Sequence, residues 1–236
     1  MKKSILLSFA LPVILLAGCS NIKDVKAENG PLVSHIKGEA KTEKVYWHTD
    51  EDGTNSVKVK NDKFNITIPS RTSKVSVKVA DDKSLKDAET VTVPKSKKLA
   101  DYASFVSDFE SYYSRYDENT DISLTSAPDK LDGLEEIGSS NDSPDKGIKI
   151  RATTDGDVLT GLTINLFVDD DKSTSSMFVA AIASAADTLG SSSSKVLKGV
   201  STAANKNQKI KVVSNGYVYD FEPIKGIMIS CTIYKK

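Results

Sequence analysis

The sequence predicts an α+β protein in which a small antiparallel β-sandwich precedes a domain with helices on one face of an antiparallel sheet. Apolar and polar residues alternate between residues 39 and 94, as in short half-buried strands. From Leu99 the apolar residues recur every three or four positions, as on one face of a helix. We therefore predict a sandwich at 39–94, a basic linker at 95–98 and an α+β domain at 99–236.

The chain begins with a segment that is typical of a secretory signal. Met1, Lys2 and Lys3 form a short basic region, and residues 4–15 are almost all apolar. An apolar segment of about 12–14 residues is too short to span a bilayer of about 30 Å as a helix. A basic start and small residues at the end are the pattern of a cleaved signal. Residues 1–18 are therefore predicted to be a signal peptide.

The residues Leu16-Ala17-Gly18-Cys19 at the end of this segment resemble the lipobox of bacterial lipoproteins. The resemblance implies cleavage between Gly18 and Cys19 and a diacylglyceryl thioether on Cys19, which would anchor the protein at the extracytoplasmic face of the cell membrane. An ordinary signal peptide with a chance cysteine is the alternative. Residues 19–38 contain few apolar side chains, two glycines and a proline, so we expect a tether there.

Five short alternating runs build the predicted sandwich, with Asp52-Gly53 and Asn61-Asp62 as turns between them. The runs contain Val45 and Trp47; Val57 and Val59; Phe64, Ile66 and Ile68; Val75, Val77 and Val79; Val91 and Val93. The stretches 57–69, 75–81 and 90–94 resemble the bacterial immunoglobulin-like modules of surface proteins. The resemblance implies a spacer or an adhesive unit.

The α+β domain is predicted to open with a helix over residues 99–116, capped by Ser96 and packed through one apolar stripe. The stripe consists of Leu99, Tyr102, Ala103, Val106, Phe109, Tyr113 and Tyr116. The polar segment 117–147 is predicted to be a long connection with one helical turn near 129–137.

Two strands, two helices and three strands are predicted to follow. The turn signals are Thr154-Asp155-Gly156-Asp157 and Asn215-Gly216, and Gly190 ends the first of the two helices. The elements are strands at 148–152 and 159–168, helices from Ser173 and around Val196, two strands flanking Asn215-Gly216, and a strand at 227–234. This order resembles the C-terminal half of small, uncharacterised bacterial lipoproteins.

Composition argues against several classes of function and of covalent linkage. Loss of Lys2 and Lys3 with the signal turns 32 basic residues into 30, against 32 acidic ones, so no basic surplus attracts nucleic acid. The lysine-rich composition resembles that of surface lipoproteins from AT-rich Gram-positive bacteria. With Cys19 lipidated, Cys231 has no disulfide partner, and its alternation with Ile229 and Ile233 predicts a buried small hydrophobe.

The sequence predicts no catalytic, cofactor-binding or metal-binding residue. His35 and His48 fall outside the α+β domain and no second thiolate joins them, which argues against zinc and against a catalytic triad. Residues 117–128 have the oxygen ligands Asp117, Asn119 and Asp121 at calcium-loop spacing, but Ile122 and Pro128 stand where glycine and a bidentate acid are needed. Neither a nucleophile elbow nor a glycine-rich phosphate loop occurs in the sequence.

These observations favour a non-enzymatic cell-surface lipoprotein that is held in the membrane by its lipid and contacts a surface protein or a wall component. The alternative is a wall-associated hydrolase or a substrate-binding accessory lipoprotein. A pocket lined by polar groups in residues 97–236 would favour ligand binding, and an exposed apolar patch would favour a protein partner.

Overall fold

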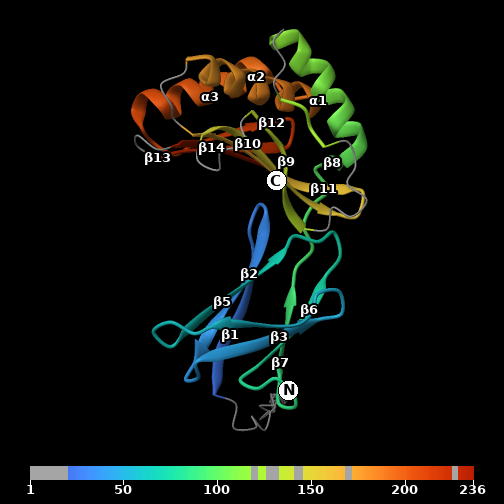
Figure 1. Cartoon of the computed structure of the whole chain (residues 1–236), viewed down its shortest axis with the longest axis vertical. Helices are drawn as coiled ribbons and strands as arrows, with labels where there is room; N and C mark the ends of the chain where they lie inside the picture. The colour runs from blue at the N-terminus through green and yellow to red at the C-terminus, as the bar shows by residue number, and fades with distance from the viewer. Residues whose placement is uncertain (1–20, 118–121, 126–132, 141–145, 168–171, 225–227) are drawn as a thin grey trace, which may run out of the picture.

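The computed structural model describes residues 21–117, 122–125, 133–140, 146–167, 172–224 and 228–236. It has two lobes, which Figure 1 shows stacked along the long axis of the molecule. One buried cluster of apolar side chains lies between Ile22 and Val93, and a second lies between Leu99 and Ile233. We call these the N-terminal lobe (residues 21–94) and the C-terminal lobe (residues 99–236).

Two antiparallel sheets face each other in the N-terminal lobe. The first has the strand order β1-β2-β5, and the second has the order β4-β3-β6-β7. The strands are β1 (Ile22–Asn29), β2 (Val33–Ala40), β3 (Lys44–Thr49), β4 (Gly53–Lys58), β5 (Lys63–Pro69), β6 (Val75–Ala80) and β7 (Glu89–Val93). Ile36 and Ile66 of one sheet meet Val45 and Val77 of the other in a fully buried core. The five predicted runs are thus strands, and in β5 and β6 the alternation reflects one buried face.

The expected tether at 19–38 is wrong from Ile22 onward, because β1 and β2 belong to the sandwich. Two features hide these strands in the sequence. Asp24 has φ +56° within a bulge of β1, which shifts the side-chain alternation. In β2 the buried position Ser34 is polar, and its hydroxyl donates to Asn29 Oδ1 at 3.0 Å. The sandwich therefore starts at Ile22 and not at residue 39.

A seven-stranded antiparallel sheet forms the base of the C-terminal lobe, with the order β12-β13-β14-β11-β10-β9 and the short β8 paired with β11. The strands are β8 (Ala100–Asp101), β9 (Gly133–Ser139), β10 (Gly147–Asp155), β11 (Val158–Phe167), β12 (Ile210–Ser214), β13 (Tyr217–Ile224) and β14 (Met228–Lys235). The helices in the described residues are α1 (Tyr102–Tyr116), α2 (Lys172–Thr188) and α3 (Ser193–Lys206). Figure 1 shows them on one side of the sheet. The predicted α+β class, with antiparallel sheets and helices, is confirmed.

The structure corrects two elements of the C-terminal lobe. The helical turn expected near 129–137 is wrong where it can be compared, because Gly133–Ser139 is a strand paired with β10. The first helix begins at Tyr102 and not at Leu99, because Ala100 and Asp101 pair with β11; the cap residue is Asp101 and not Ser96. Its buried face includes Phe105, which the predicted stripe omitted, whereas Ala103 and Tyr116 are exposed.

Local signals in the sequence placed the turns and ends of the remaining elements correctly. Asn215 and Gly216 both have positive φ in a two-residue hairpin, and Gly190 has φ +63° just after α2. Cys231 is fully buried in β14, as predicted, and burial raises the pKa of its thiol well above the usual value. Within the described residues, no helix combines the length and the apolar character that crossing a membrane requires.

Candidate ligand pocket at the lobe junction

The residues predicted to carry the lipid and the cleavage site, Cys19 and Gly18, lie outside the described residues. So do most of the calcium-like segment 117–128 and the acidic run Asp169–Asp171 that precedes α2. The candidate site therefore comes from the junction between the lobes, where four segments that are far apart in the sequence meet.

An ion-pair cluster around Arg71 connects the two lobes. Arg71 follows β5, and its side chain is only 4% exposed. Its Nε lies 3.0 Å from Glu51 Oε2 and its Nη2 3.9 Å from Asp52 Oδ1, both in the β3–β4 turn of its own lobe. Its Nη1 lies 3.5 Å from Asp155 Oδ1 at the end of β10 in the other lobe. The turn predicted at Asp52-Gly53 is thus present, and its acidic residues Glu51 and Asp52 pair with a buried arginine.

The Asp155 carboxylate accepts two hydrogen bonds from Thr72 and forms an ion pair with Arg71. Its Oδ2 accepts a hydrogen bond from the Thr72 amide at 2.8 Å and a short one from the Thr72 hydroxyl. Burial opposes ionisation of Asp155, but these hydrogen bonds and the charge of Arg71 outweigh it. The pKa of the carboxyl is therefore lowered from its usual value. An ionised Asp155 thus ties β10 to the loop after β5.

Close backbone packing completes the junction. Gly161 of β11 lies against Pro31 in the β1–β2 turn, where a Cβ atom would come within 2.3 Å of the Pro31 carbonyl oxygen. The Ser96 amide donates to the Arg71 carbonyl at 2.6 Å, so the linker is also held. The Leu99 amide donates to the Leu159 carbonyl oxygen at 2.8 Å. Backbone hydrogen bonds, an ion pair and a close glycine contact thus all connect the two lobes at the junction.

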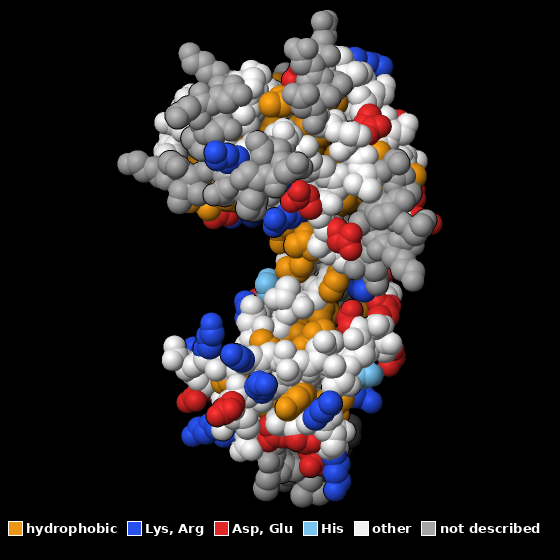
Figure 2. All heavy atoms as spheres, viewed as in Figure 1, with side chains coloured by type: hydrophobic (Ala, Val, Ile, Leu, Met, Phe, Trp, Pro, Cys, Tyr) orange, Lys and Arg blue, Asp and Glu red, His pale blue; other side chains and the backbone are white. Residues whose placement is uncertain are grey.

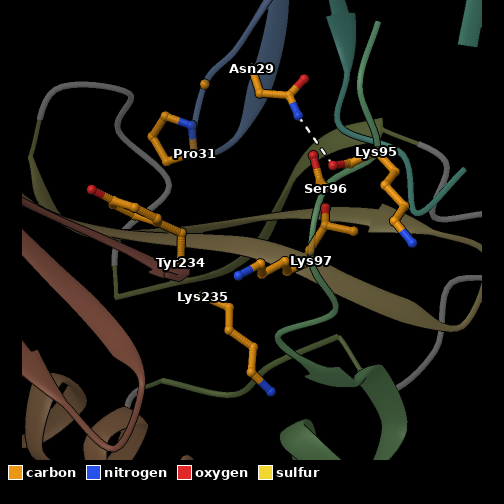
Figure 3. A pocket seen from close by; sticks show the side chains of 9 residues that line it. Asn29, Pro31, Lys95, Ser96, Lys97, Tyr234 and Lys235 are labelled. Carbon is orange, nitrogen blue, oxygen red and sulfur yellow. Dashed lines mark hydrogen bonds between the residues drawn. The ribbon is translucent and has the colours of Figure 1, made fainter. Parts of the chain in front are cut away.

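A cavity of about 330 Å³ opens beside this junction. It is lined by Asn29, Gly30 and Pro31 of the β1–β2 turn, Lys95, Ser96 and Lys97 of the linker, Thr160 of β11, and Tyr234 and Lys235 of β14. Figure 3 shows Pro31 and Tyr234 on the same side of the pocket, with Lys97 extending across it toward Tyr234. The side chains of Lys95 and Lys235 begin at the rim and point away from the pocket in different directions. In Figure 2 the molecule narrows at the junction and is hollowed on one side.

Three of the nine lining residues are lysines and none is acidic. Lys97 Nζ donates to a main-chain oxygen of Lys236, and the Asn29 amide group donates to the Lys95 carbonyl at 3.3 Å. Lys235 Nζ lies 5.4 Å from the centre of the Tyr217 ring. Within the described residues, neither Lys95 nor Lys235 forms an ion pair with a carboxylate. The pocket therefore combines a positive rim with an aromatic and proline wall.

The neighbouring sheet face, opposite the helices, is also polar but balanced in charge. Lys211 Nζ lies 3.1 Å from Asp220 Oδ2, and Lys149 Nζ lies 3.4 Å from Glu136 Oε1. Lys211 also donates to the Tyr234 hydroxyl at 3.4 Å, which links this face to the pocket. The lysines of the sheet face thus have carboxylate partners, in contrast to those at the pocket rim.

Two other parts of the described structure could in principle bind a ligand: clusters of metal-ligating side chains and a depression between α1 and α2. Among the described residues, no group of three or more histidine, cysteine, aspartate or glutamate side chains could hold a metal ion. An apolar depression between α1 and α2 is lined by Tyr116, Ser175, Ser176, Val179 and Ala180, and the Tyr116 hydroxyl donates to Asp187 at 2.5 Å.

No protein-family model matches the chain, and no curated protein matches it significantly. Sequence reasoning missed the junction pocket because its lining comes from positions 29–31, 95–97, 160 and 234–235. The one local sequence feature that belongs to the pocket is the basic segment Lys95–Lys98, whose composition predicts only a linker. Its partners at the pocket become evident only when β14 and the β1–β2 turn are placed beside it.

Proposed function

We propose that this protein is a lipid-anchored lipoprotein of the bacterial cell surface that acts as a non-enzymatic binding module. The observation that carries the proposal is the Leu16-Ala17-Gly18-Cys19 motif directly before the fold. Only Ser20 and Asn21 separate Cys19 from β1, and the Asn21 side chain donates to Asp81 at 2.8 Å. A lipid on Cys19 would therefore hold the N-terminal lobe close to the membrane and present the C-terminal lobe outward.

The N-terminal lobe is proposed to be an immunoglobulin-like spacer. In that fold the A, B and E strands share one sheet and the C, F and G strands share the other. Here the first, second and fifth strands form one sheet, and the third, sixth and seventh strands lie in the other with the fourth strand at its edge. This strand order supports the proposal.

The alternative role as a substrate-binding accessory lipoprotein gains support from the junction pocket. Its volume of about 330 Å³ falls at the lower end of the range of small-ligand sites, about 300–1,000 Å³. The pocket involves both lobes, whereas the prediction placed polar ligand contacts in residues 97–236 alone. We therefore propose that the bound partner is contacted at the junction and not only on the α+β domain.

Anchoring is tested by changing Cys19→Ala and following membrane fractionation and the mass of the mature chain. We expect unprocessed precursor or soluble protein, because the lipid is the attachment. Cys231→Ala is the matched control, since it removes the other, buried cysteine. Normal anchoring and normal mass of the Cys19 variant would refute the proposal.

A further inference from the structure

We infer that the junction pocket binds a small anionic ligand, with a phosphate or carboxylate group on its lysine side and the body of the ligand against Tyr234 and Pro31. The inference rests on the proposed binding role and gives it a ligand class. It is independent of the lipid on Cys19, so the two can fail separately.

The charge of the pocket is the first support. Lys95, Lys97 and Lys235 lie around one cavity whose lining holds no acid. The ammonium group of Lys97 crosses the cavity, whereas those of Lys95 and Lys235 point outward from its edge, so all three add to the positive potential around it. On the adjacent sheet face the protein offsets its lysines with carboxylates, as Lys211 with Asp220 and Lys149 with Glu136 show. The rim of the pocket is therefore arranged for a negative charge that arrives from outside.

The donors around Lys97 are the second support. Lys97 Nζ donates to a main-chain oxygen of Lys236, and an ammonium group has two further N–H donors that a ligand oxygen can accept from. Ser96 contributes a hydroxyl from the same linker. Ammonium and hydroxyl groups are the donors that phosphate and carboxylate oxygens accept from in proteins.

The wall and the setting of the pocket are the third support. The ring of Pro31 and the aromatic face of Tyr234 lie on the same side, which suits a ring or a short carbon chain that bears the anion. The contacts of Arg71, Asp155 and Gly161 connect the two lobes beside the pocket, so we expect little ordering when a ligand binds. A pre-formed, two-part site of this size fits a small phosphorylated or carboxylated molecule better than a polymer surface.

The experiment follows amide chemical shifts of the full-length protein in a neutral detergent. The probes are inorganic phosphate, glucose 1-phosphate and, as the uncharged match, glucose. We expect the phosphate-bearing probes to shift the amides around Asn29, Lys97 and Tyr234, and glucose to leave them unchanged. Vesicles that contain an anionic phospholipid test whether a lipid headgroup is the source of the anion; shifts from vesicles but not from the soluble probes would overturn the inference.

Two variants separate a specific site from general charge attraction. Lys97→Gln removes the ammonium group that crosses the pocket, and we expect Kd for glucose 1-phosphate to rise at least about tenfold, equivalent to about 1.4 kcal/mol. Lys98→Gln removes the same charge one residue away, where Lys98 pairs with Asp101 at 2.6 Å and does not line the pocket; its Kd should stay within about twofold. Equal weakening in both variants, equal binding of glucose, or no shift with either phosphate probe would overturn the inference. A melting curve confirms that each variant is folded.

Discussion

Changing Asp155→Ala tests whether the two lobes unfold as one unit. The variant removes the acceptor of two hydrogen bonds from Thr72 and an ion-pair partner of Arg71 in the other lobe. A hydrogen bond to a charged group contributes about 1.5–3 kcal/mol. Loss of one partner of a buried ion pair costs about 3–5 kcal/mol when the remaining charge is left uncompensated. In the variant Glu51 still pairs with Arg71 at 3.0 Å, so the arginine is not left uncompensated. We therefore expect Asp155→Ala to lower the free energy of unfolding by about 3 kcal/mol, the lower end of that range.

The assay uses probes that report on different lobes. Trp47, the one tryptophan of the sequence, lies in β3 of the N-terminal lobe, whereas the helices of the described residues all lie in the C-terminal lobe. Urea titrations followed by tryptophan fluorescence and by far-ultraviolet circular dichroism therefore monitor the lobes separately. In the unaltered protein we expect coincident transitions, and in Asp155→Ala a fluorescence transition at lower urea than the dichroism transition.

Asp157→Ala is the matched control for this experiment. Asp157 lies in the same β10–β11 turn and is exposed, so the variant removes an equal charge without touching Arg71 or Thr72. We expect its transitions to stay within about 0.5 kcal/mol of the unaltered protein. Superimposable curves for Asp155→Ala and the unaltered protein would refute the coupling of the lobes through this carboxylate.

The same coupling should depend on pH in a defined direction. The pKa of Asp155 is lowered in the folded protein from 3.8, so the ionised form is the one that the fold stabilises. This contribution is fully present above 3.8 and is lost as the pH falls through the lowered folded-state pKa. The two transitions should therefore separate on acidification in the unaltered protein, while Asp155→Ala should lack this component.

Three further predictions concern packing. Phe109→Ala should destabilise the C-terminal lobe by about 3–5 kcal/mol in thermal unfolding, since Phe109 is fully buried. Tyr112 is half-exposed on the same helix, so Tyr112→Ala should cost about 1 kcal/mol or less. Gly161→Ala should shift the amides of the β1–β2 turn, because its Cβ would collide with the backbone of Pro31; unchanged spectra would contradict this close approach. Cys231 should resist thiol reagents until the protein unfolds, and fast labelling of the native protein would show that β14 opens.

Elements whose signals are local could be predicted from the sequence. Asn215-Gly216 marks its hairpin because both residues adopt positive φ, and the order of α2 and α3 follows from helical spacing and Gly190. The burial of Phe109 followed from its position in the middle of a stripe. In these cases the backbone requirement or the buried face is encoded within a few neighbouring residues.

Elements that depend on distant partners could not be predicted in this way. β9 has an exposed Leu134 and a buried Ile137 with two glutamates between them, so it lacks alternation and is a strand because β10 pairs with it. In the sequence Gly38 is typical of a flexible tether. In the structure a Cβ atom at this position would come within 2.5 Å of the Phe64 ring on the neighbouring strand β5. Such requirements become visible only when the sheet is assembled.

The placement of β1 also bears on which anions could reach the junction pocket. The eight residues of β1 run from Ile22 to Asn29, which lines the pocket, and a strand rises about 3.3 Å per residue. The pocket therefore lies about 25 Å along the chain from the start of the fold. Ser20 and Asn21 can extend the distance from a lipid on Cys19 by only about 10 Å. If Cys19 carries the proposed lipid and the N-terminal lobe stands upright between the pocket and the bilayer, headgroups of that bilayer would lie out of reach of Lys97. In that arrangement we expect the ligand to be soluble or to be carried by a structure that extends outward from the membrane.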